Sequence, residues 1–182
     1  MKPVPFRERA LSYSERVPWI PTPRRLELGG GGATTLYTHR DEAGVSWWSD
    51  GYAIFRGAAP EDLRAAYRAA GRPVDVPYAP VLLPYYASLA HGTRLNSPIA
   101  GYEVSSQASP DQVPVAVFAF SDGPELHLDA RYLAHAETHY PGCTFWRIAR
   151  SICAVRDEHG HTLLGVVEAR KLPPKRVHTE AS

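Results

Sequence analysis

The sequence predicts one α+β domain built mainly from short antiparallel strands. Runs of β-branched and aromatic residues recur along the chain and are separated by turns that contain Asp and Gly. Only two segments place apolar residues at helical spacing. Many of the 17 prolines fall between these elements, where they end strands and helices. A length of 182 residues corresponds to about one domain, and 44% apolar residues can form a core without disulfides or metal ions.

Three parts of the chain differ in composition. Residues 1–28 form a proline-rich basic arm, residues 29–172 the domain, and residues 173–182 a basic tail. The net charge is only +1, but residues 1–28 carry six basic and three acidic groups, and residues 170–182 carry four basic groups and one acidic group. Basic ends on a mildly acidic body can contact nucleic acid or an acidic partner. The alternative is that both ends are solvated tails.

The first half of the domain predicts three strands followed by a helix. The strands are expected over residues 34–40, 45–49 and 52–56, with a Ser-Asp-Gly hairpin turn joining the last two. The helix is expected over residues 60–70, because proline and two acids suit its first turn and a glycine follows its end. The expected buried face of this helix consists of Leu63, Ala66, Tyr67 and Ala70.

The second half predicts a strand pair, a longer helix and three further strands. Prolines interrupt residues 72–114, where only residues 81–86 and 101–105 are predicted as short strands. The remaining strands are expected over residues 115–120, 125–128, 144–149, 152–156 and 162–169. The helix is expected over residues 129–140, with Asp129 as its N-cap. Its core face is expected to comprise Tyr132, Leu133, Ala136 and Tyr140.

An internal repeat connects the two halves. A strand, a Ser-Asp-Gly turn, a second strand, a helix and a glycine stop occur twice in this order, around residues 34–72 and 113–142. The two turns lie 72 residues apart. Two copies of one element order indicate a duplicated unit. The alternative is that both copies are generic hairpins that lead into helices.

Each predicted helix carries a row of basic or protonatable side chains beside its apolar face. The rows consist of Arg64, Arg68 and Arg72 on the first helix and of Arg131, His135 and His139 on the second. Residues four apart lie on the same side of a helix. Such rows can follow a phosphate backbone without reading the base sequence. The alternative is that each row is an ordinary solvated helix face.

Two stretches carry a resemblance to a known family. ELHLDARYLAHAETHYPG, residues 125–142, leads from a strand into a helix, and HTLLGVVEARKL, residues 161–172, forms the closing strand. SWWSDGYAIFRG, residues 46–57, is a strand, a turn and a strand. In these stretches the chain resembles a bacterial sliding-clamp domain, the processivity factor of the replicative DNA polymerase. The family's closing Met-Pro-x-Arg-Leu stands here as Glu-Ala-Arg-Lys-Leu at residues 168–172.

The resemblance implies two βαβββ-type halves with antiparallel sheets and two helices on one face. It also implies a non-enzymatic domain that associates with double-stranded DNA independently of sequence, or with replication or repair proteins, and that can form homo-oligomers. One such domain is too short for a ring-forming subunit, which carries two or three, and is expected from a phage or mobile element. DNA contact would use the two helical rows with Arg170 and Lys171, and as auxiliaries Arg7, Arg9, Arg24 and Arg25.

An alternative function is a protein-interaction module, such as an inhibitor or accessory factor, that never contacts DNA. Its contact residues would come from the aromatic pairs Trp47-Trp48 and Tyr85-Tyr86. Neighbouring residues of a strand face opposite sides, so one member of each pair is expected in the core and the other at the surface. An outward aromatic side chain can contact a protein or stack on a base.

The third alternative is a histidine-based metallohydrolase. Its ligands would come from His127, Asp129, His135, His139, His159 and His161. Zinc requires three or four converging ligands, and the helical pair is not part of an HExxH motif because residue 136 is alanine. Neither cysteine lies in a nucleophile signature, and no G-x-S-x-G motif occurs. The sequence therefore predicts no enzyme, no metal site and no cofactor.

The sequence also predicts a cytoplasmic protein without a membrane partner. No apolar run has the length of a membrane span, and charges and prolines over residues 1–23 are unlike a secretory signal. Cys143 and Cys153 fall on successive predicted strands and could pair. We expect instead two free, buried thiols, as is usual in a reducing compartment.

Overall fold

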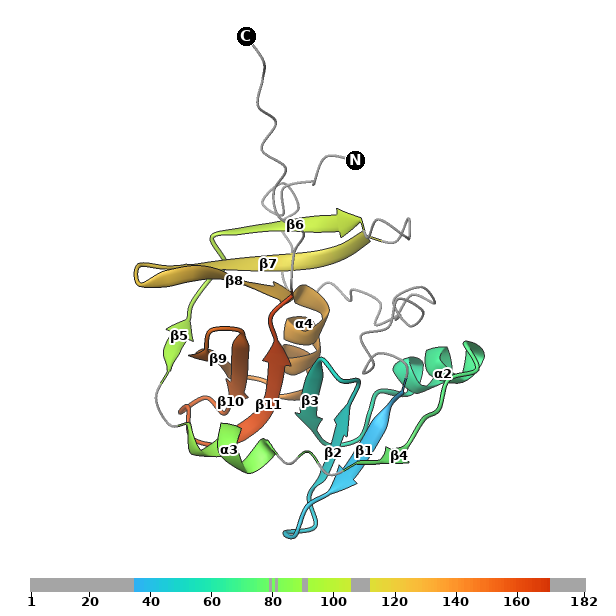
Figure 1. Cartoon of the computed structure of the whole chain (residues 1–182). Helices are drawn as coiled ribbons and strands as arrows, with labels where there is room; N and C mark the ends of the chain where they lie inside the picture. The colour runs from blue at the N-terminus through green and yellow to red at the C-terminus, as the bar shows by residue number, and fades with distance from the viewer. Residues whose placement is uncertain (1–34, 79, 81, 90–91, 106–111, 171–182) are drawn as a thin grey trace.

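The fold is mixed α+β, with a large, mostly antiparallel sheet, a small sheet and few helices (Figure 1). The computed structural model describes residues 35–78, 80, 82–89, 92–105 and 112–170. The predicted basic arm and basic tail lie outside these residues, as do Arg7, Arg9, Arg24, Arg25 and Lys171. Among the described helices, none is long and apolar enough to cross a bilayer.

The strands form two sheets. The large sheet has the order β4-β1-β2-β3-β11-β10-β9-β5, and only the β1–β4 pair is parallel. Its strands are β1 (Tyr37–Arg40), β2 (Ser46–Ser49), β3 (Ala53–Arg56), β4 (Val76–Pro77), β5 (Thr93–Leu95), β9 (Thr144–Ala149), β10 (Ile152–Arg156) and β11 (Leu163–Glu168). The small antiparallel sheet contains β6 (Ala100–Ser105), β7 (Gln112–Phe120) and β8 (Gly123–Asp129).

The described helices are α2 (Glu61–Ala69), α3 (Leu83–Ser88) and α4 (Ala130–His139). The predictions of α2 and α4 are confirmed within one or two residues, as are most predicted strands. The prediction of a strand over residues 81–86 is wrong, because this segment is α3, with Pro84 in its first turn. Two short strands were not predicted from the sequence: β4, which has only two residues and includes Pro77, and the three-residue β5.

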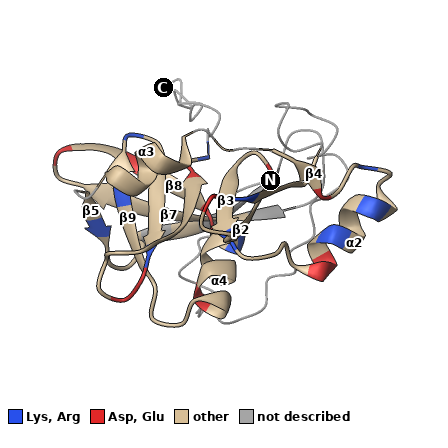
Figure 2. Ribbon diagram, turned by 90° about the horizontal axis from the view of Figure 1, so that it is seen from below, with Lys and Arg blue, Asp and Glu red and all other residues tan. Residues whose placement is uncertain are grey.

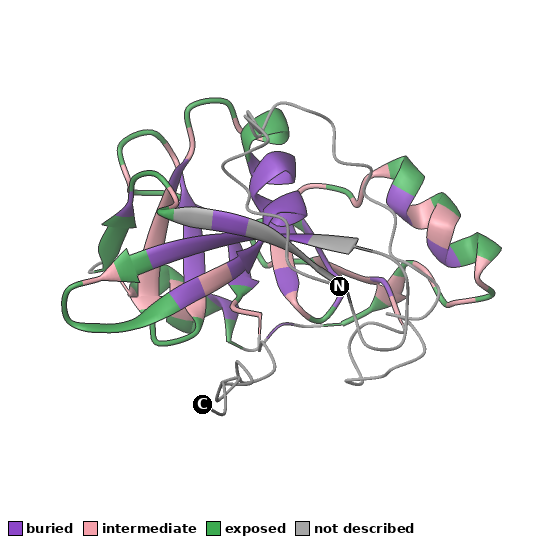
Figure 3. Cartoon of the chain, turned by 90° about the horizontal axis from the view of Figure 1, so that it is seen from above, coloured by how far each residue is buried: buried purple, intermediate pink, exposed green. Residues whose placement is uncertain are grey.

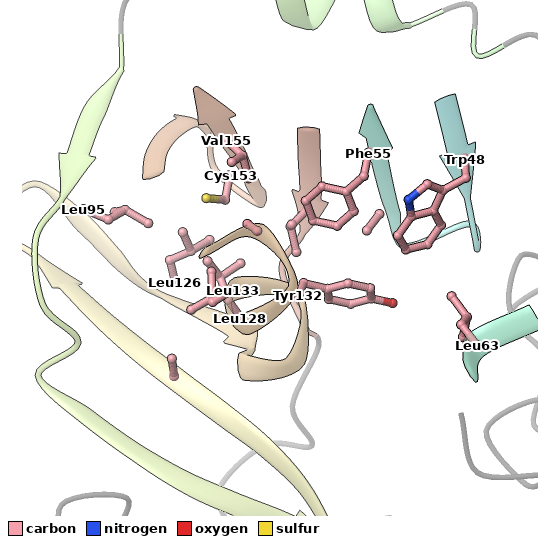
Figure 4. Close-up of a cluster of buried hydrophobic side chains, with 14 of the residues drawn as sticks. Trp48, Phe55, Leu63, Leu95, Leu126, Leu128, Tyr132, Leu133, Cys153 and Val155 are labelled. Carbon is pink, nitrogen blue, oxygen red and sulfur yellow. The ribbon is translucent and has the colours of Figure 1, made fainter. Parts of the chain in front are cut away.

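Helix α4 lies between the two sheets (Figure 1), much of its surface is buried (Figure 3), and it contributes to the main core (Figure 4). Tyr132 and Leu133 pack in one cluster with Phe55 and Val155 of the large sheet and with Leu128 of the small sheet. Asp129 ends β8 and caps α4, since its carboxylate accepts a hydrogen bond from the Arg131 backbone N–H. The last strand of the small sheet therefore continues directly into the helix that both sheets cover.

A second, smaller cluster lies on the other face of the large sheet. Trp47, Leu163 and Val166 are buried there together with Leu83 of α3. Because Trp47 and Trp48 are neighbours in β2, they point to opposite faces of the sheet, and each is buried in a different cluster. The large sheet is thus covered by α4 on one face and partly by α3 on the other.

The junction of β3 and β11 requires a residue without a side chain. Gly165 pairs with Phe55 across this junction. A Cβ atom at position 165 would lie 2.8 Å from Cε1 of Phe55 and 2.9 Å from the carbonyl oxygen of Ile54. Real Cβ atoms do not approach other heavy atoms so closely. Glycine at this position therefore allows the two halves of the large sheet to join.

The two Ser-Asp-Gly turns share an element order but have different surroundings. Asp50 is buried, accepts hydrogen bonds from the backbone N–H groups of Tyr52 and Ala53, and accepts one from the Tyr132 hydroxyl at 2.6 Å. Asp122 lies at the surface, where its side chain is 72% exposed. The first turn therefore ties the large sheet to α4, whereas the second closes the exposed β7–β8 hairpin.

Candidate functional site

Basic and acidic residues both occur along α2 (Figure 2), and the basic row is paired with acidic side chains. Arg64 lies 2.5 Å from a carboxylate oxygen of Asp75, and Arg68 donates a hydrogen bond to Glu61 at 2.7 Å. The same glutamate lies 3.7 Å from Arg64. With Asp62 also in the first turn of α2, acids balance the three arginines of the row in number. The α2 surface therefore offers a polyanion no net positive charge.

The prediction of a solvent-facing row on α4 is wrong for two of its three members. Arg131 and His135 are only 7% and 8% exposed, whereas His139 is exposed. Both sheets cover α4, and its small alanines allow other groups to pack closely around it. Arg131 binds the buried Asp129 carboxylate through two nitrogens, at 3.0 and 2.8 Å. These two residues therefore stabilise the fold and are inaccessible to DNA.

Arg170 belongs to the same buried ion cluster. Its guanidinium lies 3.9 Å from a carboxylate oxygen of Asp129, and its backbone N–H donates to His127. Its side chain is 21% exposed. The end of the described chain is thus hydrogen-bonded to β8, and the Arg170 guanidinium lies beside the buried Asp129 carboxylate.

His135 lies in an aromatic cage beneath β2 and β3. The centroid of its ring lies 4.7 Å from that of Phe55, 5.2 Å from that of Trp48 and 4.3 Å from that of His139. Burial, together with the neighbouring His139, lowers the pKa of His135 to about 3. The imidazole is therefore neutral at physiological pH and gives no electrostatic attraction for phosphate.

The described side chains do not form the histidine-based metal site considered from the sequence. In the described part of the chain, no three His, Cys, Asp or Glu side chains converge on a point where they could hold an ion. Cys143 and Cys153 are free thiols; Cys153 is buried as predicted, whereas Cys143 is only half-buried. Burial raises the pKa of Cys143 to about 11 and that of Cys153 to about 12. Both are therefore protonated at neutral pH and are poor nucleophiles.

The burial of the two aromatic pairs differs from the prediction. Trp47 and Trp48 are both buried, so neither provides the expected outward contact. The indole N–H of Trp47 donates to Asp41 at 3.0 Å. Tyr85 and Tyr86 lie on a helix rather than a strand; Tyr85 is 56% exposed and Tyr86 is half-buried. Of the four predicted contact residues, only the α3 pair reaches the surface.

Tyr86 lines a groove that was not predicted from the sequence. Between the outer face of the large sheet and the segment that leads into α3 lies a hollow of ≈ 370 Å³. We call it the tyrosine groove; its principal lining residues are Tyr37, Ile54, Tyr78, Leu82, Tyr86 and Glu168. The rings of Tyr37 and Tyr78 lie 5.1 Å apart and are tilted by 47°. Burial and the nearby Glu168 raise the pKa of Tyr86, so its hydroxyl stays protonated.

The most exposed apolar side chains gather at this groove. The described residues include four large hydrophobic side chains that are strongly exposed: Tyr78 (50%), Leu82 (53%), Tyr85 (56%) and Ile99 (45%). Tyr78 and Leu82 line the groove, and Tyr85 adjoins Tyr86 with ring centroids 5.7 Å apart. Only Ile99 lies elsewhere, before β6. A usable signal was present in the sequence, because Tyr78, Leu82, Tyr85 and Tyr86 follow one another in the proline-interrupted segment.

No protein-family model, curated protein or solved structure matches this chain. The resemblance to sliding-clamp domains therefore stays a prediction.

Proposed function

We propose that this chain is a non-catalytic protein-interaction module that holds a partner protein in the tyrosine groove. The observation that carries the proposal is the position of three strongly exposed apolar side chains: Tyr78 and Leu82 line one groove, and Tyr85 lies beside its lining residue Tyr86. Contiguous apolar surface of this kind costs solubility and is typical of binding sites. Tyrosines suit such a site, because each combines a rigid apolar ring with a hydroxyl that can hydrogen-bond.

A selection from a display library of random 12-residue peptides tests this function. We expect the wild-type protein to enrich peptides, and we expect Tyr78→Ala and Tyr86→Ala to lose at least about tenfold in affinity for them, the usual cost of truncating an aromatic anchor. Ile99→Ala is the matched control, since it removes an exposed apolar side chain outside the groove. Enriched peptides that bind all three variants equally well would place the contact elsewhere and overturn the proposal.

A second candidate is a clamp-like domain that associates with DNA or with replication and repair proteins. One observation favours it: β8, α4, β9, β10 and β11 follow one another in the βαβββ order that the sequence resemblance implies. Against direct DNA contact, Arg131 and His135 are buried and the α2 arginines are balanced by acids. This candidate therefore relies mainly on association with proteins or on self-association.

Light scattering with and without a short DNA duplex, at low and moderate salt, tests the second candidate. A ring-sized oligomer, or a complex that dissociates as salt rises, is the result this candidate requires. A monomer that ignores DNA at both salt concentrations would eliminate DNA association. That result would leave the groove-based function unaffected.

A further inference from the structure

The chemistry of the tyrosine groove narrows the class of its ligand. Among the described residues that line it, Glu168 is the only one that carries a charge, and tyrosines dominate the rest. No hydrogen bond to another described residue holds the hydroxyl of Tyr37, Tyr78 or Tyr86. These hydroxyls can therefore donate to a ligand. The groove consequently presents flat aromatic faces, several hydrogen-bond donors and one carboxylate.

The floor of the groove offers no edge to a ligand that binds as an added strand. The floor includes Ile54 of β3 and Val166 of β11, which pair with each other. Both strands are internal to the large sheet, because β3 also pairs with β2 and β11 also pairs with β10. Strand addition requires a free sheet edge with unpaired N–H and C=O groups. The floor therefore offers side chains only. The sheet edge at β4 lies next to Tyr78, but Val76 and Tyr78 direct their N–H groups toward β1 and Pro77 has none, so this edge offers no donor for an added strand.

The dimensions and the shape of the walls disfavour a helical ligand. A helix with its side chains is about 10–12 Å across and needs a long apolar channel for anchors spaced at i, i+3 and i+7. Here Tyr78 lines both the ≈ 370 Å³ groove and a more open neighbouring hollow of ≈ 680 Å³, which Thr38, Arg40 and Pro77 also line. A thin, extended ligand that passes over Tyr78 from one hollow to the other fits this arrangement better than a helix does.

A polyproline II segment meets all of these conditions. It is extended, has three residues per turn and forms no internal hydrogen bonds, so its carbonyl groups are free to accept from tyrosine hydroxyls. Proline rings pack on aromatic faces, and aromatic-lined grooves are a recurrent means of binding such segments. The segment loses little conformational entropy because it is already extended before binding. The carboxylate of Glu168 would favour a ligand with a basic residue beside its prolines.

We propose that the tyrosine groove binds a proline-rich segment of a partner protein in the polyproline II conformation, with prolines on either side of Tyr78 and a basic residue next to Glu168. This inference rests on the proposed function, since it names the ligand class of the same groove.

Fluorescence anisotropy with three labelled 10-residue peptides tests the inference on the full chain. The first contains Leu-Pro-Pro repeats and one terminal arginine, the second has every proline replaced by alanine, and the third has the arginine replaced by glutamate. We expect the first peptide to bind at least about tenfold more tightly than the second, and Tyr78→Ala to remove that preference. Ile99→Ala should bind all three peptides as the wild type does.

The contribution of Glu168 to peptide binding is tested by comparing the wild type with Glu168→Gln. Glu168→Gln keeps the shape of the side chain and removes the charge. We expect it to weaken the arginine peptide about threefold at low salt and to abolish the preference for arginine over glutamate, as loss of one exposed charge pair does. An unchanged preference in Glu168→Gln would overturn the assignment of the basic residue.

The outcomes separate the ligand class from the function. If the display selection enriches groove-dependent peptides that lack proline, and the proline-rich peptide does not bind, the polyproline inference fails and the proposed function stands. If no peptide of any class depends on Tyr78, both fail. Affinity that rises when Pro18, Pro21 and Pro23 are replaced by serine would assign the groove to the chain's own arm and overturn a partner ligand. If the chain self-associates and Tyr78→Ala abolishes this, the groove binds a second copy of the chain, and a partner ligand is overturned as well.

Discussion

Acidification from pH 6.5 to pH 4.5 is expected to destabilise the folded protein by roughly 2–3 kcal/mol through His135 alone. In the unfolded chain the imidazole has a pKa near 6.5, and in the folded protein burial lowers the pKa to about 3. Between these values the unfolded chain binds more protons, so protons favour unfolding. The contribution of the neutral, buried imidazole is complete above pH 6.5 and is lost as the pH falls toward 3.

Urea denaturation at several pH values measures this effect. His135→Leu removes the titrating group at similar volume, and we expect it to flatten the dependence of unfolding free energy on pH between 6.5 and 4.5. His159→Leu is the control for the substitution itself, because the His159 side chain is 71% exposed. Backbone hydrogen bonds lower the pKa of Asp157 to about 2. The pH range of the experiment therefore ends above the range in which folded Asp157 titrates. Equal slopes for wild type and His135→Leu would contradict the buried, neutral state of His135.

Asp129→Ala is expected to lower the free energy of unfolding by about 3–5 kcal/mol, the range for breaking one side of a buried ion pair. The change removes the carboxylate that binds the Arg131 guanidinium, leaving a buried charge poorly compensated. It also removes the cap of α4. Equilibrium denaturation at pH 7 gives the difference directly.

Asp122→Ala is the matched control for this change. Asp122 also pairs with an arginine, since its carboxylate lies 3.0 Å from a guanidinium nitrogen of Arg147, but its own side chain is 72% exposed. An exposed pair of this kind contributes about 1 kcal/mol or less. If both substitutions cost the same, the cluster of Asp129, Arg131 and Arg170 does not have the buried character assigned to it.

Local sequence patterns predicted the elements well where a single rule decided the outcome. Helix α4 begins at Ala130 because Asp129 caps it, and the turn at residues 49–51 joins two strands as Asp-Gly turns do. Helix α3 was missed because its six residues are too few for a helical period to emerge, and because Tyr85 and Tyr86 also suit a strand. The length of an element thus limits what periodicity can reveal.

Which side chains are buried depends on the elements that cover each face of a helix or sheet. Local sequence patterns carry no information about those elements. An amphipathic period assigns one buried side to a helix, but α4 is covered by two sheets, so Arg131 and His135 are buried as well. The same reason explains Trp47, which α3 covers from the face opposite α4. The alanines at positions 130, 134 and 136 are the sequence feature that accompanies burial around most of α4.

The groove could be predicted only in part. The exposed tyrosines lie within residues 78–86, but Tyr37, Ile54 and Glu168 come from strands that pair or pack only in the folded sheet. Assembly of the groove therefore depends on the order of strands in the large sheet. No spacing along the chain encodes that order.

Backbone amide NMR of the labelled full chain, titrated with a display-selected peptide, tests most directly whether the tyrosine groove is the interaction surface. We predict that the largest shift changes fall on residues of the groove, such as Tyr37, Ile54, Tyr86 and Glu168, and that signals of α2 stay in place. Changes concentrated on Arg64, Arg68 and the rest of α2, with the groove signals unmoved, would contradict the account and return the binding surface to the basic row.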